Sequence, residues 1–217
     1  MNTGLRIFGA GALALALAGC SGANQTKLAA AVLPDLYTTA ERDIAALRVQ
    51  GAIDNGSPVS VVILTDRGQN SVLVPINENR GVVTWLAVDG STVSTRDGLI
   101  IATRGLGGDL LAADVSQTNA LLQARKPGRV QRFHTELTGD IQADTRAFVC
   151  DITDSGPGVL ELPDGVRDIR LMIENCYGAQ AEFLNLYWIA DTDGTILHSS
   201  QWLGPTIGNV TLRQLRP

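Results

Sequence analysis

The chain has 217 residues, a formal net charge of −5, 45% hydrophobic residues and 18% charged residues. This length is enough for one domain with a hydrophobic core, or for two small ones. A mildly acidic chain without a block of basic residues is a poor candidate for binding nucleic acid or anionic lipid surfaces. Composition therefore argues against proteins that bind nucleic acid or anionic lipid through a basic surface.

The chain begins with the layout of a bacterial lipoprotein export signal. Arg6 supplies a positive charge, residues 7–17 are uncharged and apolar, and Leu17-Ala18-Gly19-Cys20 has small residues before a cysteine. The apolar stretch is shorter than the roughly 20 residues of a membrane-spanning helix. We therefore expect residues 1–19 to be removed and Cys20 to carry lipid. The alternative is an ordinary secretory signal.

The residue after the cysteine predicts the destination. Ser21 stands where an inner-membrane retention signal usually has Asp, which predicts a lipid anchor on the periplasmic face of the outer membrane. Without residues 1–19, which hold one Arg and no acid, 198 residues with a formal net charge of −6 remain. Residues 20–32 would be a lipidated tether. Residues 33–217 are predicted to form one β-rich domain, with Pro127–Gly128 as the candidate internal boundary.

Two helices are predicted. Apolar residues at spacings of three and four indicate one face of a helix near 35–49, formed by Leu33, Leu36, Ala40, Ile44 and Leu47. The motif Thr38-x-x-Glu41 fits a capping box, and Gly51 fits a C-terminal stop. A shorter helix near 116–125 is predicted to end before Pro127–Gly128.

Short β-branched runs separated by polar or glycine turns predict strands elsewhere. They cover residues 59–64, 71–76, 82–88, 93–95, 99–103, 129–137, 145–152, 167–176, 183–190, 195–202 and 209–215. Predicted turns include Asn77-Glu78-Asn79. The alternation at 133–137 and 183–188 is typical of half-buried antiparallel strands. The predicted fold class is therefore mainly β: an antiparallel barrel or sandwich with an N-terminal helix and one short middle helix.

The two cysteines after Cys20 predict a disulfide. Cys150 and Cys176 form an even pair, and the periplasm is oxidising. A loop of roughly 25 residues would contribute about 3 kcal/mol on the chain-entropy model. Two buried free thiols are the alternative. We predict no metal and no cofactor, because a metal site at these cysteines would need more soft ligands and the two histidines, His134 and His198, lie far from them in sequence.

Motifs that could carry chemistry favour turns. Gly105-Leu106-Gly107-Gly108 has Leu110 where a dinucleotide fingerprint needs its third glycine, and no helix start follows, so the stretch predicts a sharp turn with positive φ. Asp191-Thr192-Asp193-Gly194 lacks the closing glutamate of a calcium loop and predicts a hairpin turn. The pairs Asp140/Asp144 and Asp151/Asp154 have the right residue type for a glycosidase, but turn roles explain them better. No hydrolase motif occurs.

Three tryptophans are candidates to stack on sugar rings: Trp85, Trp188 and Trp202. Core packing is the commoner role for a large aromatic side chain in a β-rich protein. Trp202, next to Gly204-Pro205, is expected to be partly exposed.

Two motifs resemble a known family. Residues 96–110, read as Arg-Asp-Gly-Leu-Ile-Ile-Ala-Thr-Arg-Gly-Leu-Gly-Gly-Asp-Leu, resemble the signature of the YjbF/GfcB-type lipoproteins, which accompany group 4 capsule and exopolysaccharide export operons. Gln201-Trp202-Leu203-Gly204-Pro205 is similar to the C-terminal motif of that family. The resemblance covers nearly the whole chain. It implies a β-barrel-like, non-enzymatic outer-membrane lipoprotein that assists polysaccharide secretion, and it carries over no catalytic residues.

The predicted contact surface combines the two motifs. Its members are Arg104, Gly105, Gly107, Gly108, Asp109, Gln201 and Trp202. Arg104 and Asp109 would offer hydrogen bonds to sugar hydroxyls or to a polysaccharide-export protein. The alternative is a local ion pair that braces the turn. The rival functions are a periplasmic enzyme that modifies the polysaccharide and a structural envelope lipoprotein with no glycan role.

Overall fold

Antiparallel strands dominate the structure, as predicted. The computed structural model describes residues 34–137 and 142–216, and the chain from Thr39 onward forms one compact unit. The strands are β1 (Val59–Leu64), β2 (Gln69–Asn79), β3 (Val82–Ala87), β4 (Thr92–Arg96), β5 (Leu99–Arg104), β6 (Leu110–Asp114), β7 (Gly128–Leu137), β8 (Ala143–Leu162), β9 (Gly165–Gly178), β10 (Glu182–Ala190), β11 (Ile196–Trp202) and β12 (Asn209–Arg216). A short 3-10 helix, η1 (Thr65–Arg67), joins β1 to β2.

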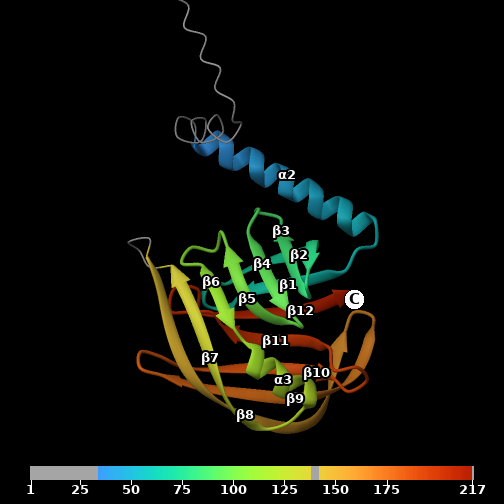
Figure 1. The fold of residues 1–217 in the computed structure, drawn as a ribbon. Coiled ribbons are helices and arrows are strands. Elements are labelled where there is room, and N and C mark those ends of the chain that lie inside the picture. The colour runs from blue at the N-terminus through green and yellow to red at the C-terminus, as the bar shows by residue number, and fades with distance from the viewer. Residues whose placement is uncertain (1–33, 138–141, 217) are drawn as a thin grey trace, which may run out of the picture. The chain divides into compact units, whose positions relative to one another are not determined.

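These strands form one twelve-stranded sheet in the order β5-β4-β3-β2-β1-β12-β11-β10-β9-β8-β7-β6 (Figure 1). The edges β5 and β6 are joined by a glycine-rich turn. Arg104 donates hydrogen bonds to the carbonyls of Leu110 (3.2 Å) and Leu111 (3.4 Å). The amide of Leu110 donates to Thr103 Oγ1 at 3.1 Å. These bonds make the sheet nearly closed and barrel-like, and they satisfy groups that an open edge would leave free.

The first described helix is longer than predicted. Helix α2 (Pro34–Asp54) contains both Thr38 and Gly51, so Thr38 does not mark its start and Gly51 does not mark its end. The chain leaves the helix at Asn55 and Gly56, and Gly56 has a φ of +77°. A glycine in this conformation is the usual helix terminator, and it lies five positions beyond the predicted one.

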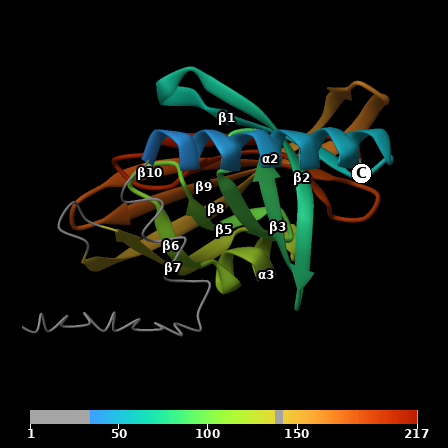
Figure 2. The same cartoon turned by 90° about the horizontal axis from the view of Figure 1, so that it is seen from above.

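The predicted apolar face of α2 is wrong at Ile44 and Leu47, the two members whose side chains the structure describes; Leu33 and the side chains of Leu36 and Ala40 lie outside the described part. Ile44 is 53% exposed and Leu47 is 73% exposed. The buried side chains are Ala45 and Val49, which pack with Val74 of β2 and Leu86 of β3. Helix α2 runs across these two strands (Figure 2). The small Ala45 side chain lets the helix approach the sheet closely. Packing of the sheet, rather than spacing alone, therefore decides which face is buried.

Helix α3 (Ser116–Ala124) lies where the sequence predicts it. Its chain direction changes at Arg125, which has a φ of +50°, just before Pro127 and Gly128. The strands on both sides of Pro127–Gly128 belong to the same sheet. No helix in the described part of the chain is long and apolar enough to span a bilayer.

Three strand features differ from the predictions. Strand β6 was not predicted. Strand β8 runs well beyond 145–152, because the residues from Asp154 to Pro157 form a bulge and the ladder resumes after it, whereas β9 extends the predicted 167–176 by two residues at each end. The turn after β2 lies at Arg80–Gly81 rather than at Asn77-Glu78-Asn79.

The predicted disulfide is present in this ladder. Cys150 of β8 lies directly opposite Cys176 of β9, and the two sulfurs are bonded. Both residues belong to a buried cluster that includes Phe148, Met172 and Tyr187. The bond therefore ties two strands together inside the core.

Candidate functional site: a tryptophan-lined cleft

The described residues form a cleft composed of two overlapping cavities of about 370 and 460 Å³. Volumes of this size are typical of small-molecule sites, which range from about 300 to 1,000 Å³. Most of the lining comes from β2, β3, β11, β12 and the turn between β10 and β11, with single residues from β1, β4, β9 and α3. Residues shared by both cavities are Glu78, Val83, Trp85, Asp193, Thr195, Leu197 and Gln214.

Trp85 is the aromatic member of this lining. It lies on β3, is half-buried, and its indole Nε1 donates a hydrogen bond of 2.9 Å to Thr95 Oγ1 on β4. This bond fixes the ring and uses its single polar hydrogen. Trp85 therefore lines the cleft with the apolar part of its ring, beside the lining residues Leu73 and Val83.

Three carboxylates line the cleft: Glu78, Asp97 and Asp193. Asp97 Oδ2 accepts a hydrogen bond of 2.7 Å from Asn119 Nδ2 on α3. Asp193 Oδ1 accepts one of 2.9 Å from the amide of Thr195, and hydrogen bonds from Thr195 hold the pKa of Asp193 below its ordinary value. Asp193 is therefore ionised at neutral pH, and the lining is acidic.

One base, Arg167, is present among the described residues that line the cleft. Its Nη2 donates to Asp164 Oδ2 at 2.6 Å, in an ion pair at the tip of the β8–β9 hairpin. Neutral hydrogen-bonding groups complete the lining, with Gln123 from α3 and Gln214 from β12. The cleft thus offers more acceptors than cationic donors.

The turn between β10 and β11 is the predicted Asp-Gly hairpin turn. Gly194 has a φ of +82°. Asp191 lies 3.8 Å from Arg125 and 4.0 Å from Arg170, whereas Asp193 binds the amide of Thr195. Because the two carboxylates face different partners, they brace a turn and do not form a calcium loop.

The glycine-rich turn is held by its own acid. Asp109 accepts hydrogen bonds from Thr103 Oγ1 (3.0 Å), the amide of Gly105 (2.8 Å) and the amide of Leu106 (3.0 Å). Arg104 donates instead to backbone carbonyls. In the described structure, therefore, Arg104 and Asp109 brace the turn separately and not as the ion pair that was the alternative.

The glycines of this turn have the predicted conformation. Gly105, Gly107 and Gly108 have φ values of +85°, +71° and +79°. A Cβ on Gly108 would lie 2.4 Å from Thr206 Cγ2, whereas one on Gly107 would meet open space. Gly108 is required for close packing as well as for backbone geometry.

One arginine joins the two family-like motifs. Arg67 donates hydrogen bonds to the carbonyls of Leu106 (2.5 Å) and Gly107 (3.2 Å) in the glycine-rich turn. It also donates to the carbonyl of Thr206 at 2.9 Å, directly after the C-terminal motif. Arg67 was not predicted as a site residue. Segments that are far apart in sequence thus share one guanidinium.

Gln201 lies inside the protein and not on a contact surface. It is fully buried, and its Nε2 donates to the carbonyl of Gly98 (3.0 Å) and to Ser199 Oγ (2.9 Å). Its Oε1 accepts the amide of Ile100 at 3.0 Å. Gln201 therefore bridges β11 to β5, and its burial corrects the expectation of an outward contact.

Trp202 is half-buried within an aromatic cluster. Its ring stacks on Phe183 at a centroid distance of 4.5 Å and contacts Phe148 at 6.0 Å and His134 at 5.9 Å. Trp202 is absent from the described lining of the cleft, where Trp85 stands instead. The contact role of Trp202 remains a prediction.

A buried ionic network lies beside this cluster. Glu174 is fully buried and accepts hydrogen bonds from Thr118, Asn185 and Tyr187, each at 2.7 Å. Arg132, also fully buried, lies 3.0 Å from Glu174. Burial opposes the charge of Glu174, but Arg132 and these hydrogen bonds hold its pKa below the ordinary value.

His134 belongs to the same network and is not suited to act as a base. Its Nε2 accepts a hydrogen bond of 2.8 Å from Arg132 Nε. Burial, together with Arg132 and Arg146, lowers the pKa of His134 well below its ordinary value. The ring is therefore neutral, inaccessible to solvent and already used as an acceptor.

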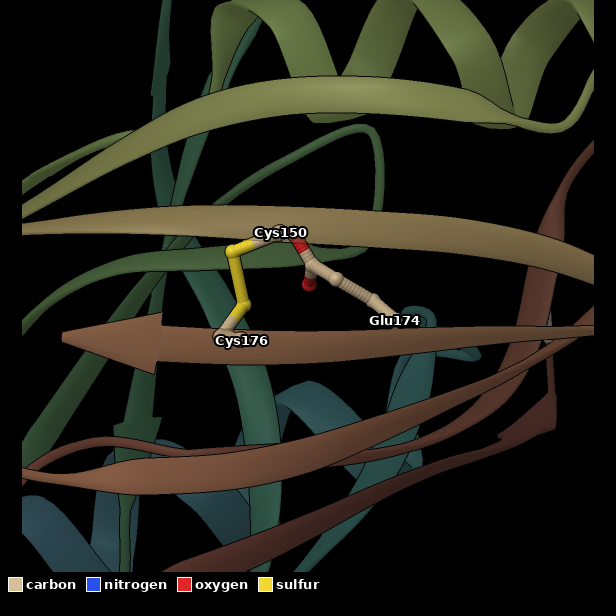
Figure 3. Close-up of side chains that lie close together, drawn as sticks. All are labelled: Cys150, Glu174 and Cys176. Atoms are coloured by element: carbon tan, nitrogen blue, oxygen red, sulfur yellow. A yellow bond between two sulfur atoms is a disulfide. The ribbon is translucent and has the colours of Figure 1, made fainter.

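Cys150, Glu174 and Cys176 are buried, have side chains of the types that bind metals, and place their candidate ligand atoms within 4.8 Å of one another (Figure 3). Both sulfurs are consumed by the disulfide, and the carboxylate of Glu174 is surrounded by donors. A metal needs thiolates and free carboxylate lone pairs. This trio therefore does not fit a metal.

The proposed carboxylate pairs are also separated by their partners. Asp151 pairs with Arg129 at 2.7 Å, and Asp154 pairs with Arg170 at 2.6 Å. Asp144 pairs with Arg146 at 3.0 Å, while Asp140 lies outside the described residues. Cys20 also lies outside them.

The fold defines a mainly antiparallel β protein of a kind already seen in a solved lipoprotein. The lipoprotein YmcC of Escherichia coli K12 superposes with a TM-score of 0.67 at 19% identity, over 75% of this chain and 88% of its own. A Bacteroides fragilis exported protein with a YmcC-like fold has a TM-score of 0.29 at 9% identity, over 74% of this chain and 94% of its own. No curated protein matches the chain.

The sequence match is more specific than the fold. The family model described as "Group 4 capsule polysaccharide lipoprotein gfcB, YjbF" matches residues 29–215. The chain belongs to this family. The resemblance found in the sequence is thereby confirmed, together with the mainly β fold that it implied.

Proposed function

We propose that the protein is a lipid-anchored accessory factor for the export of a capsular or extracellular polysaccharide, held on the periplasmic face of the outer membrane through Cys20. The family match over residues 29–215 is the observation that carries this proposal, because the family is described by capsule polysaccharide and by lipoprotein character. The lipobox Leu17-Ala18-Gly19-Cys20 supports the anchor.

We further propose that the protein assists export without catalysing a reaction. A general acid that acts at neutral pH needs a raised pKa. In the cleft, the pKa of Asp193 is lowered, and the histidine with the strongest pKa shift, His134, is buried in a network outside the cleft lining. These features favour binding over hydrolysis. A polysaccharide-modifying enzyme and a structural lipoprotein remain the rival functions.

Gene deletion with complementation tests the proposal. Deletion should reduce the secreted polymer, the unaltered gene should restore it, and Cys20→Ala should fail to restore it although the protein is made. Purified protein should leave the length of the polymer unchanged. Normal secretion by the deletion strain would overturn the export role, and shortened polymer would favour the enzyme.

A further inference from the structure

We infer that the cleft around Trp85 binds a short, uncharged segment of polysaccharide, with the Trp85 ring as the stacking surface. This inference deepens the proposed function and rests on it. The contact surface predicted from the sequence lay elsewhere, on the glycine-rich turn and at Gln201 and Trp202, and Trp85 was one of three tryptophans that the sequence could not rank. The cleft is assembled from strands that are distant in sequence, and no sequence motif points to it.

The shape of the cleft suits a chain. The first cavity reaches inward to Ser60 and Ser199, which are both buried, while the second reaches outward to Pro58, which is exposed. Trp85 lines both cavities. A ligand stacked on Trp85 can therefore extend from the interior to the mouth, as a segment of a longer polymer must.

The lining offers an apolar surface and hydrogen-bond acceptors, which match the apolar faces and the polar rim of a sugar ring. A pyranose ring has C–H groups on its faces and hydroxyls at its rim. Trp85, held by Thr95, presents an apolar ring to the C–H groups on the face of the sugar, as large aromatic side chains do in ligand sites. Glu78 and Asp193 supply charged acceptors for hydroxyl donors, and such hydrogen bonds are stronger than neutral ones.

The charge of the lining selects the sugar class. Three acids, Glu78, Asp97 and Asp193, line the first cavity, and the one described lining base, Arg167, is paired with Asp164. A uronic acid or phosphate in the cleft would lie close to like charges, which costs free energy. The ligand is therefore a run of neutral or N-acetylated sugars.

The test measures binding by the full mature lipoprotein in detergent. The probe is the polymer secreted by the producing strain, cut to oligosaccharides. Trp85→Ala should weaken binding about tenfold or more, since a central tryptophan is a typical hot spot. The control is Trp188→Ala, because Trp188 is also half-buried but packs edge-on against His198, with ring centroids 4.4 Å apart, and is not among the described residues that line the cleft. It should bind as the unaltered protein does.

A second pair of variants keeps the test valid if Trp85→Ala does not fold. Glu78→Gln removes an exposed carboxylate of the cleft, and Glu182→Gln removes an exposed one on β10. Only Glu78→Gln should weaken binding of neutral fragments, and only Glu78→Gln should improve binding of fragments that carry carboxylates. Chemical reduction of those carboxylates should improve binding to the unaltered protein.

Three results would overturn the inference. They are no binding of any fragment, equal losses for Trp85→Ala and Trp188→Ala, or tighter binding of a hexalysine peptide than of the sugar fragments, which would indicate a basic protein partner. The proposed function is judged separately. If deletion abolishes secretion while the purified protein binds no fragment, the export role stands and the glycan site falls.

Discussion

The buried carboxylate of Glu174 gives the sharpest test of the core. In Glu174→Gln the size of the side chain is nearly unchanged, but Arg132 is left as a buried charge without its counter-ion. Breaking a buried ion pair by removing one partner costs about 3–5 kcal/mol. For a domain of this size each kcal/mol corresponds to about 2–4 °C in Tm. We therefore expect Tm to fall by roughly 6–20 °C.

The matched control is Asp151→Asn, which removes the same charge from the exposed Arg129–Asp151 pair; Asp151 lies on β8, the strand next to the one that carries Glu174. Exposed pairs contribute little, so its thermal midpoint, Tm, should stay near that of the unaltered protein. Both midpoints are measured at pH 7 with the disulfide intact. Equal midpoints for Glu174→Gln and Asp151→Asn would refute the reasoning.

The pH dependence of the same variant supplies a second readout. The folded-state pKa of Glu174 lies below its ordinary value of 4.5. A lowered pKa contributes stability above the unfolded pKa, and this contribution is lost as the pH falls through the folded value. The difference between the unaltered protein and Glu174→Gln should therefore narrow as the pH falls below about 4.5.

Three further predictions concern the histidine, the glycine-rich turn and the disulfide. The folded-state pKa of His134 lies below 6.5, so stability should fall below that pH by up to about 1.4 kcal/mol per pH unit, and His134→Gln should flatten the profile in urea titrations. Gly108→Ala should lower Tm more than Gly107→Ala, because only its Cβ meets a neighbouring side chain. Reducing Cys150–Cys176 should lower the free energy of unfolding by about 3 kcal/mol.

Each of these has a result that would contradict it. A pH profile unchanged by His134→Gln would mean that folding does not lower the pKa of His134. Equal falls in Tm for Gly107→Ala and Gly108→Ala would mean that the destabilisation arises from the backbone φ alone and not from the contact with Thr206. Unfolding that is unaffected by reduction would mean that the Cys150–Cys176 bond does not constrain the unfolded chain.

Local patterns predicted most strands because alternation has a period of two residues and needs no knowledge of the partners. They failed where the local signal was misleading. Leu110-Leu111-Ala112-Ala113 has no alternation and no β-branched residue, so β6 was missed. Gly156-Pro157-Gly158 reads as a turn, yet the ladder continues past its bulge.

The buried side of α2 could not be predicted from spacing, because both sides of this helix carry apolar residues. Ile44 and Leu47 satisfy the helical period as well as Ala45 and Val49 do. The neighbouring strands decide between them: Val74 and Leu86 present the surface that covers Ala45 and Val49.

The cleft could not be predicted from the sequence, because it too depends on contacts between distant segments. Trp85 was a candidate with no feature to rank it above Trp188 or Trp202. Its role depends on β3 lying near the turn that carries Asp193, a contact between distant segments. The acids had no catalytic spacing, so nothing in the sequence brought Glu78 and Asp193 together.

The pairing of β1 with β12 has a consequence for the order of folding. Strand Val59–Leu64 forms its ladder with Asn209–Arg216, so the middle of the sheet cannot be completed until the last residues have been synthesised. Contacts of such long sequence separation form slowly. A nascent chain is therefore kept from closing its sheet early, which is the condition that a polypeptide must meet to cross a membrane unfolded before it assembles on the other side.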